Sequence, residues 1–188
     1  MKFNSIKKIH DGEFISRYDL HYETEDGKPK TYEIISRNHD LKTLEELQNK
    51  HADAVVLILT DESGERILLN REFRMAAGQF VYNFPAGLIE PDETPEEAAA
   101  RELYEETGLT LTEIRDRIGL SYSAIGFSNE TNVCIVGTAT GEFSESTSSY
   151  EEIEAKWYTR SEVRELLKTA PFAARTQAWC YCWSHETK

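Results

Sequence analysis

Apolar and polar side chains alternate along residues 12–37 with the two-residue period of a β-strand. Side chains at every second position of a strand share one face, so this segment is predicted to form strands over 14–22 and 30–36. The pair Asp26 and Gly27 stands between these two segments and is a strong signal for a hairpin turn. The front of the chain is therefore predicted to be a β-hairpin.

After residue 50 the pattern changes. Residues 53–60 read DAVVLILT, a continuous apolar run that predicts a central strand covered on both faces. Further strands are predicted at 67–69, 80–84, 118–123, 132–139 and 155–159. Ser161 is expected to cap a helix that ends at Lys168, and a terminal helix is predicted from 173 to about 183. Strands mixed with a few helices in this order predict the α/β class, as an α/β/α sandwich with a mixed sheet.

One further helix has clear signals at both ends. Thr94, Pro95 and Glu97 form a capping box with proline at the first helical position. Gly108 suits the left-handed residue that closes a helix, so the helix is predicted between these points. Residues 87–93, which precede it, are rich in Gly, Pro and Asp and predict an ordered loop.

The composition is that of a globular domain, with 188 residues of which 39% are hydrophobic and 29% charged. A net charge of -13 argues against nucleic acid or an anionic membrane as a partner. The same charge would repel a phosphorylated substrate, so a metal ion or arginines must attract it locally. No segment approaches the roughly 20 apolar residues of a membrane span, and the first ten residues carry no signal-peptide core.

The three cysteines, Cys134, Cys180 and Cys182, are odd in number and lack the spacing of a zinc site. They are expected to be reduced packing residues, which suits a cytoplasmic location. The five histidines show no metal-binding spacing either.

The predicted helix at 95–107 carries Glu102, Glu105 and Glu106 at spacings that place them on one face. Like charges at these positions repel, and a hard divalent cation such as Mg²⁺ reverses that cost because it prefers carboxylate oxygens. Arg101 lies four residues before Glu105 and is able to pair with it. A solvated acidic helix without any ligand is the ordinary alternative.

The spacing across residues 87–109 argues against that alternative. Gly87, Glu93 and the run Arg101-Glu102-Leu103-x-Glu105-Glu106-x-Gly108-Leu109 resemble the Nudix box with every defining position filled. The Nudix family hydrolyses nucleoside diphosphates linked to another moiety. The resemblance covers nearly the whole chain and is closest to the ADP-ribose and ADP-sugar pyrophosphatase branch, through 72–74 (Glu-Phe-Arg) and 84–87 (Phe-Pro-Ala-Gly).

The resemblance implies a metal site and a catalytic base. Glu102, Glu106 and the Ala86 carbonyl are expected to bind Mg²⁺, with Mn²⁺ as an alternative. Glu105 belongs to the catalytic set either as a ligand of a second cation, reached through water, or as the partner of Arg101. The glutamate that activates water is expected in the acidic loop at 144–154, as Glu151 or Glu152.

The resemblance also implies the substrate contacts. Phe14 and Tyr32 fall on the positions that stack on the base, and Arg37 on a nearby substrate contact. The alternative for both aromatic residues is simple packing within the hairpin. Arg74 is expected either to bind phosphate, which suits its guanidinium fork, or to pair with an acidic side chain at the edge of the core.

Two regions follow from the resemblance, an N-terminal hairpin region for dimerisation and base stacking at 1–45 and a Nudix hydrolase domain at 46–188. A homodimer is expected to bury Phe14, Tyr18 and Tyr32, because an isolated hairpin is marginally stable in water.

The implied reaction is Mg²⁺-dependent hydrolysis of ADP-ribose or a related ADP-sugar to AMP and a sugar phosphate. Two positions depart from the branch, since Asn83 replaces a usual glutamate and Ile125 a common proline. Another nucleoside-diphosphate substrate (a UDP-sugar, NADH or a dinucleoside polyphosphate) therefore stays open. A non-catalytic nucleotide-binding module is the remaining alternative.

Overall fold

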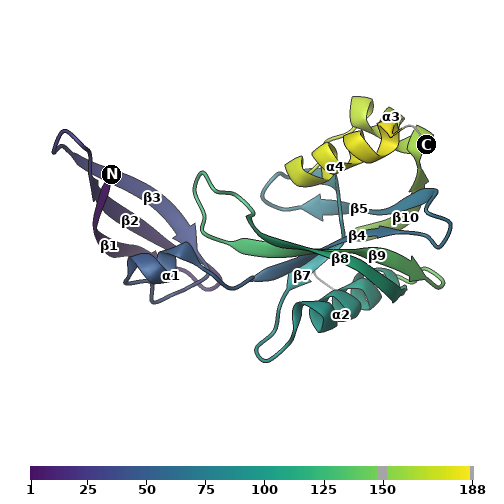
Figure 1. The fold of residues 1–188 in the computed structure, drawn as a ribbon, viewed down its shortest axis with the longest axis horizontal. Helices are drawn as coiled ribbons and strands as arrows, with labels where there is room; N and C mark the ends of the chain where they lie inside the picture. Colours follow the sequence, from purple (N-terminus) through teal and green to yellow (C-terminus); the bar gives the residue numbers. More distant parts are fainter. Residues whose placement is uncertain (148–151, 187–188) are drawn as a thin grey trace. The chain divides into compact units, whose positions relative to one another are not determined.

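The structure is a computed structural model that describes residues 1–147 and 152–186 (Figure 1). The chain divides into two compact units. The front unit comprises Met1–Asp53 with Gly119–Asn132, and the sandwich unit comprises Ala54–Ile118 with Val133–Lys188. Each unit has its own cluster of buried apolar side chains. The boundary predicted after residue 45 divides the chain by function, and it stays a prediction. Packing divides the chain at a different point, after Asp53.

The front unit contains an antiparallel sheet in the order β1-β2-β3. Its strands are β1 (Lys2–Asp11), β2 (Ser16–Glu23) and β3 (Pro29–Ser36), and helix α1 (Leu44–Gln48) follows. The predicted hairpin is confirmed as β2 and β3, with Gly27 at a positive φ of 77° in the turn. Strand β1 was missed because almost all of its residues are exposed, so no apolar face marks it.

The core of the front unit is formed by Tyr18, Leu20, Ile34 and Leu41. Tyr18 is 0% exposed within the single chain. The prediction that a second subunit buries Tyr18 is therefore wrong, because the sheet and the segment after β3 already cover it. Its hydroxyl donates a 2.7 Å hydrogen bond to the Asn38 carbonyl oxygen.

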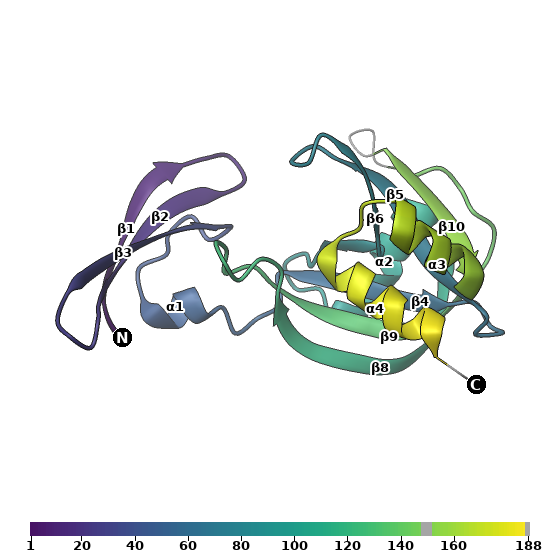
Figure 2. The same cartoon turned by 90° about the horizontal axis from the view of Figure 1, so that it is seen from above.

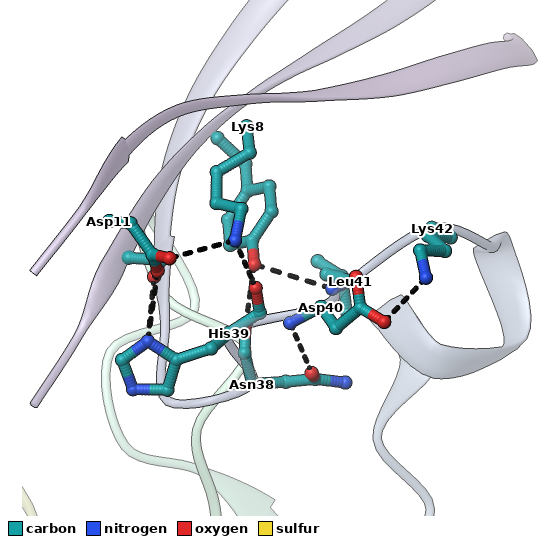
Figure 3. A network of polar contacts seen from close by, with 9 residues as sticks. Lys8, Asp11, Asn38, His39, Asp40, Leu41 and Lys42 are labelled. Atoms are coloured by element: carbon teal, nitrogen blue, oxygen red, sulfur yellow. Dashed lines mark hydrogen bonds and ion pairs between the residues drawn. The ribbon is translucent and has the colours of Figure 1, made fainter.

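A polar network joins β1 and β2 to the segment that follows β3 (Figure 3). Lys8 Nζ donates to Asp11 Oδ2 at 3.0 Å and to the His39 carbonyl at 2.7 Å. Ser16 Oγ donates to Asp11 Oδ1 at 2.5 Å, and His39 Nδ1 lies 3.0 Å from the same oxygen. The pKa of Asp11 lies well below its ordinary value because the bond from Ser16, then those with His39 and Lys8, favour the charged form. These bonds fix the turn between β1 and β2.

The larger sheet has the order β10-β5-β4-β9-β8, with β6 paired to β5 and β7 paired to β4. Helices α3 (Arg160–Thr169) and α4 (Ala174–His185) follow it, and α2 (Pro95–Thr107) lies between β7 and β8 in sequence. The strands are β4 (Ala54–Thr60), β5 (Arg66–Arg74), β6 (Gln79–Asn83), β7 (Ala86–Leu88), β8 (Thr110–Tyr122), β9 (Thr131–Thr140) and β10 (Ile153–Thr159).

Helices cover both faces of this sheet in the sandwich unit (Figure 1, Figure 2). On one face, Val56 and Ile58 of β4 share a cluster with Val163 of α3 and Cys180 of α4. Helix α2 packs against β4 and β7 on the other face. The predicted α/β/α sandwich is thereby confirmed, as is the doubly covered strand β4. Within the described residues, no helix is long and apolar enough to cross a membrane.

Three local predictions are corrected. Helix α3 begins earlier than expected because Thr159, and not Ser161, is its N-cap and accepts a hydrogen bond from the Glu162 amide. Strand β8 begins at 110 because backbone pairing to β9 extends through a charged stretch without an apolar stripe. The loop predicted at 87–93 begins within β7, which pairs with β4.

The three cysteines are free. Cys134 and Cys180 are buried in the sandwich core, as expected for packing residues, whereas Cys182 is exposed and that expectation is wrong for it.

Candidate active site

Helix α2 is built by the capping signals that the sequence contains. Thr94 Oγ1 accepts from the Glu97 amide, and Glu97 Oε2 accepts from the Thr94 amide at 2.8 Å, which completes the capping box. Gly108 closes the helix at a φ of 76°, with its amide bonded to the Tyr104 carbonyl. Leu103 is fully buried against the sheet. Burial of this face fixes how the acidic residues on either side of Leu103 are presented.

Arg101 holds several groups of the box in place. Its Nε and Nη2 donate to the two oxygens of Glu93 at 2.9 and 2.8 Å, and Nη2 also reaches the Leu88 carbonyl at 2.9 Å. Its Nη1 donates to Glu102 Oε1 at 2.8 Å and to Glu105 Oε2 at 3.2 Å. Arg101 lowers the pKa of Glu93 to about 2, and Glu93, followed by Glu102, raises the pKa of Arg101 above its usual range. One guanidinium therefore positions three carboxylates, and Glu93 has the structural partner that its sequence position suggested.

The Glu102 carboxylate lies directly against the backbone of Gly87. A Cβ atom on Gly87 would come within 1.8 Å of Glu102 Cδ, far closer than any real contact. The φ of Gly87 is not in the left-handed region, so glycine is required there for close approach alone. The close approach brings a carboxylate to β7 beside Ala86, the residue whose carbonyl was predicted as a ligand.

Glu106 points into the protein and is 6% exposed. Asn70 Nδ2 on β5 donates a hydrogen bond of 2.8 Å to Glu106 Oε2. Asn70 is itself fully buried, and its Oδ1 has no hydrogen-bond partner among the described residues. Asn70 was not predicted as a site residue, although a polar residue directly after the apolar run Ile67-Leu68-Leu69 was a signal. Buried polar groups are normally paired, so this amide marks a special position beneath α2.

The donor chemistry of this region fits a hard divalent cation, since Glu102, Glu105, Glu106 and the Ala86 carbonyl all offer oxygen. Among residues 1–147 and 152–186, however, no group of three or more His, Cys, Asp or Glu side chains is gathered closely enough to hold an ion. Ion pairs with Arg101 account for part of this separation between the carboxylates, because Glu102 and Glu105 both point toward its guanidinium. Asn70 binds Glu106. The metal-binding role of these residues stays a prediction.

Part of the acidic loop contacts the last turn of α2. The Ser144 amide donates to the Thr107 carbonyl at 3.0 Å, and the Thr147 amide donates to the Glu105 carbonyl at 2.9 Å. Of the two predicted bases, Glu151 lies outside the described residues. Glu152 is exposed, and its carbonyl accepts a bond of 3.0 Å from the Phe73 amide, which extends the pairing of β10 with β5. The described part of the loop is thus anchored at the helix that carries the box.

Arg74 lies in the sandwich unit at the end of β5. Its side chain is 58% exposed, and Nη1 lies 3.6 Å from Glu72 Oε1. Both roles considered for Arg74, phosphate binding and pairing with an acidic residue, therefore fit its position. Such a long and exposed contact contributes at most about 1 kcal/mol, so it leaves the guanidinium available.

Asn83 has a structural reason for replacing the usual glutamate. Its Nδ2 donates to Glu72 Oε1 at 3.0 Å, and its Oδ1 accepts from Thr176 Oγ1 of α4 at 2.8 Å. Thr176 Oγ1 accepts in turn from the Phe84 amide at 3.2 Å. A glutamate at 83 would place a second carboxylate against Glu72, so the amide suits this neighbour.

The predicted base-stacking residues belong to the front unit. Phe14 is 71% exposed, and the Tyr32 hydroxyl donates to the Gly126 carbonyl. Arg37 Nε donates to Glu130 Oε2 at 2.5 Å, a partner that was not predicted from the sequence. The exposed ring of Phe14 is available for stacking, and the substrate roles of Phe14, Tyr32 and Arg37 stay predictions.

Comparison with known proteins gives one family match. The family model described as NUDIX domain matches residues 50–180. An ADP-sugar pyrophosphatase from Mus musculus is 36% identical over 107 residues, which cover 55% of this chain and 46% of the mouse protein. An ADP-ribose pyrophosphatase from Bacillus subtilis strain 168 is 34% identical over 125 residues, which cover 66% of this chain and 58% of that protein. The chain thus spans about half the length of these curated relatives.

A solved structure described as an ADP compounds hydrolase matches with a TM-score of 0.72 at 18% identity. The match covers 96% of this chain and 91% of the other. At this identity the likeness concerns the fold, and it agrees with the sandwich and the small antiparallel sheet described above.

Proposed function

Because the chain belongs to the Nudix family, whose domain it matches over residues 50–180, we propose that it hydrolyses the pyrophosphate bond of an ADP-sugar. ADP-ribose is the first candidate substrate, and the products are AMP and a sugar phosphate. The names of the mouse and Bacillus relatives support this substrate class. The observation that carries the proposal is the complete box, in which Arg101 positions Glu93, Glu102 and Glu105 and Gly87 admits the Glu102 carboxylate.

We propose Mg²⁺ as the cofactor, with Mn²⁺ as an alternative. Glu102, Glu106 and the Ala86 carbonyl would hold it, because they supply the oxygen ligands such a cation prefers. When bound, the cation neutralises phosphate charge and activates water for attack on phosphorus. Glu105 either adds a ligand for a second cation or keeps Arg101 in place, and its 3.2 Å contact with Arg101 supports the second role.

The side chains of the protein would act mainly by positioning. Arg74 would bind a phosphate oxygen through its exposed guanidinium. Phe14 and Tyr32 would stack on the adenine, and Arg37 would contact the substrate beside them. Such positioning, with stabilisation of the charge on the diphosphate, supplies most of the catalysis in a hydrolysis that needs no covalent intermediate.

A loop glutamate would accept the proton from the attacking water, as Glu151 or Glu152. The box glutamates use their lone pairs on other partners, and the loop that carries these two residues is anchored to α2 through Ser144 and Thr147. Kinetics of Glu151→Gln, Glu152→Gln and the double variant over about pH 6–9 test this role. A general base acts in the transition state, so we expect a lower kcat with little change in KM. A double variant with wild-type kcat would place the base elsewhere.

Two alternatives remain for the activity. Asn83 and Ile125 favour keeping another nucleoside-diphosphate substrate in view, because both depart from the ADP-ribose branch. A non-catalytic nucleotide-binding module is opposed by the intact box. A phosphate-release panel with ADP-ribose, UDP-glucose, NADH and a dinucleoside polyphosphate separates these cases. No turnover of any of them with Mg²⁺ or Mn²⁺ would refute the enzymatic proposal.

Glu106→Gln tests the site within the same panel. The substitution keeps the shape of the side chain and its contact with Asn70 in reach, and removes the charge. We expect kcat to fall by a factor on the order of 10² or more, since charge stabilisation carries the rate. Near-normal turnover at matched Mg²⁺, in a variant that melts like the wild type, would exclude Glu106 from the site.

We further propose a homodimer formed through the front unit and a cytoplasmic location. Tyr18 does not support the dimer because it is buried within the single chain. Phe14, Ile125 and Phe127, in contrast, are 71%, 74% and 57% exposed. Burial of such aromatic and apolar surface favours association. Sedimentation velocity at micromolar concentration tests the dimer, and a fully active monomer would contradict it.

A further inference from the structure

The turn between β1 and β2, residues 12–15, carries Phe14, which is expected to stack on the adenine. The turn is closed by a 3.1 Å hydrogen bond from the Gly12 amide to the Ile15 carbonyl. A Cβ atom on Gly12 would collide with this carbonyl oxygen, so glycine is needed for the two ends of the turn to come this close. Phe14 and Ile15 are 71% and 42% exposed, so apolar packing does not hold the turn in place. Polar bonds at its two ends must do so.

The carboxylate of Asp11 joins these two ends. Asp11 is the last residue of β1 and is paired in register with Ser16, the first residue of β2. Ser16 Oγ donates to Asp11 Oδ1 at 2.5 Å, and Lys8 Nζ donates to Asp11 Oδ2 at 3.0 Å (Figure 3). One side chain therefore connects the strand that enters the turn to the strand that leaves it.

The same carboxylate reaches the segment after β3. His39 Nδ1 lies 3.0 Å from Asp11 Oδ1, and the His39 carbonyl accepts a 2.7 Å bond from Lys8 Nζ. The pKa of Asp11 lies well below its ordinary value, chiefly through the bond from Ser16, and a carboxylate has no proton to donate. His39 Nδ1 must therefore carry the proton of its bond to Asp11. Because His39 follows Arg37 by two residues, Asp11 links the Phe14 turn to the segment of another predicted substrate contact.

The physical effect of these bonds falls on the turn. The side chains of Lys8, Asp11 and His39 are 37%, 56% and 43% exposed, so each ion pair contributes little to global stability. A turn with free ends loses conformational entropy when a ligand orders it, and this loss weakens binding. A turn whose ends are already joined loses less, so the same aromatic ring binds a base more tightly.

We propose that Asp11 is a positioning residue, which holds the Phe14 turn in the arrangement that stacks on the base of the substrate. The inference rests on the proposed function, because it takes Phe14 as the stacking residue. Asp11 acts through Phe14 and not by contact with the substrate. Loss of its charge should therefore weaken binding of the nucleoside part and leave the chemical step intact.

Calorimetric titration of Asp11→Asn with AMP, the product that carries the base, tests this without the need for turnover. The amide keeps the shape of the side chain, but it loses the charge and brings a donor to the Lys8 ammonium. We expect the Kd of AMP to rise about fivefold or more. The KM for ADP-ribose should rise by a similar factor with kcat within about twofold of the wild type, because ground state and transition state lose the same binding.

Asp26→Asn is the matched control. Asp26 lies in the turn between β2 and β3 and accepts from Thr24 Oγ1 and Lys28 Nζ, as Asp11 accepts from a hydroxyl and a lysine. No residue predicted to contact the substrate lies in that turn. The Kd of AMP and the KM for ADP-ribose should therefore be unchanged in Asp26→Asn.

A double-variant cycle with Phe14→Ala shows whether Asp11 acts through the ring. Phe14→Ala alone should raise the Kd of AMP about fivefold or more, the loss expected for a base that stacks on an aromatic side chain. Without the ring the position of the turn no longer matters. Asp11→Asn should therefore raise the Kd by less than about twofold in the Phe14→Ala background. A general structural role of Asp11 would give the same factor in both backgrounds.

Hydrogen exchange in the absence of any ligand measures the turn directly. Backbone amides of residues 12–15 should exchange faster in Asp11→Asn than in the wild type, and those of residues 24–28 should not change. Asp26→Asn should show the reverse pattern. Strand β4 should keep its protection in both variants, which would show that both are folded.

The possible outcomes separate this inference from the proposed function. Wild-type AMP affinity in Asp11→Asn, with weaker binding in Phe14→Ala, would overturn the inference and leave the stacking role of Phe14 intact. Wild-type affinity in both variants would refute that stacking role and the inference with it. Equal factors for Asp11→Asn in the two backgrounds, or unchanged exchange at residues 12–15, would show that Asp11 does not act through the turn and would also overturn the inference.

Discussion

Gly87→Ala should separate the activity of this protein from its stability. The new methyl group would lie 1.8 Å from Glu102 Cδ, whereas ordinary van der Waals contact begins near 3.4 Å, so the carboxylate must retreat by about 1.6 Å. A misplacement of about 1 Å in a catalytic constellation costs on the order of 10² in rate. We therefore expect kcat/KM for ADP-ribose to fall by on the order of 10² or more, with a higher Mg²⁺ requirement.

The stability of Gly87→Ala should change little. The clash falls on the end of a flexible side chain, and the hydrogen bond from Arg101 to Glu102, which this movement would break, contributes about 1 kcal/mol. Replacing glycine by alanine at a compatible φ recovers about 0.4–1 kcal/mol from the unfolded chain. These effects nearly cancel, so the Tm should shift by less than about 3 °C.

Initial rates over a Mg²⁺ titration measure kcat/KM and the Mg²⁺ requirement. Calorimetric melting of the same samples measures the Tm. Gly119→Ala is the matched control, because a Cβ there meets no atom of the described residues within 4 Å. If Gly87→Ala keeps kcat/KM within about twofold of the wild type at saturating Mg²⁺, the position of Glu102 does not control the reaction. A variant that unfolds would refute the inference that the Glu102 side chain yields easily.

Three further predictions concern the frame around the site. Asn70→Ala should lower kcat about tenfold and the free energy of unfolding by about 1–2 kcal/mol, because Glu106 loses its 2.8 Å hydrogen bond. Steady-state kinetics and chemical denaturation measure these two changes. If Asn70→Gln restores both values, the position of the amide is not fixed as we infer. Thr94→Ala should cost about 1 kcal/mol in chemical denaturation through loss of the α2 cap, and no change would show that Glu97 caps the helix without it. Arg101 lowers the pKa of Glu93 from 4.5 to about 2, so Glu93 stabilises the folded state above pH 4.5 and this stability is lost as the pH falls toward 2. The Tm of Glu93→Gln should therefore lie below that of the wild type at pH 7, and the difference in Tm should shrink as the pH falls below 4.5. A difference in Tm that does not change with pH would refute this link between the Glu93 pKa and stability.

The sequence by itself determined the elements whose signals lie within a few residues of one another. The caps at Thr94 and Gly108 predicted α2 and both are present, because capping bonds join residues three or four apart. The apolar run at 53–60 predicted the doubly covered strand β4 for a similar reason, since burial on both faces requires apolar side chains at successive positions. The acidic face of α2 followed from helical spacing alone.

Only the tertiary structure decided how that acidic face is arranged. Packing of α2 on the sheet brings Asn70 of β5 beneath Glu106, although the two residues lie 36 positions apart. Pairing of β7 with β4 sets the Gly87 backbone against Glu102, and the segment after β3 brings Asn38 and Leu41 to Tyr18. Contacts of this kind depend on which strands become neighbours and in which register, and a local pattern of apolar and polar residues does not encode that choice.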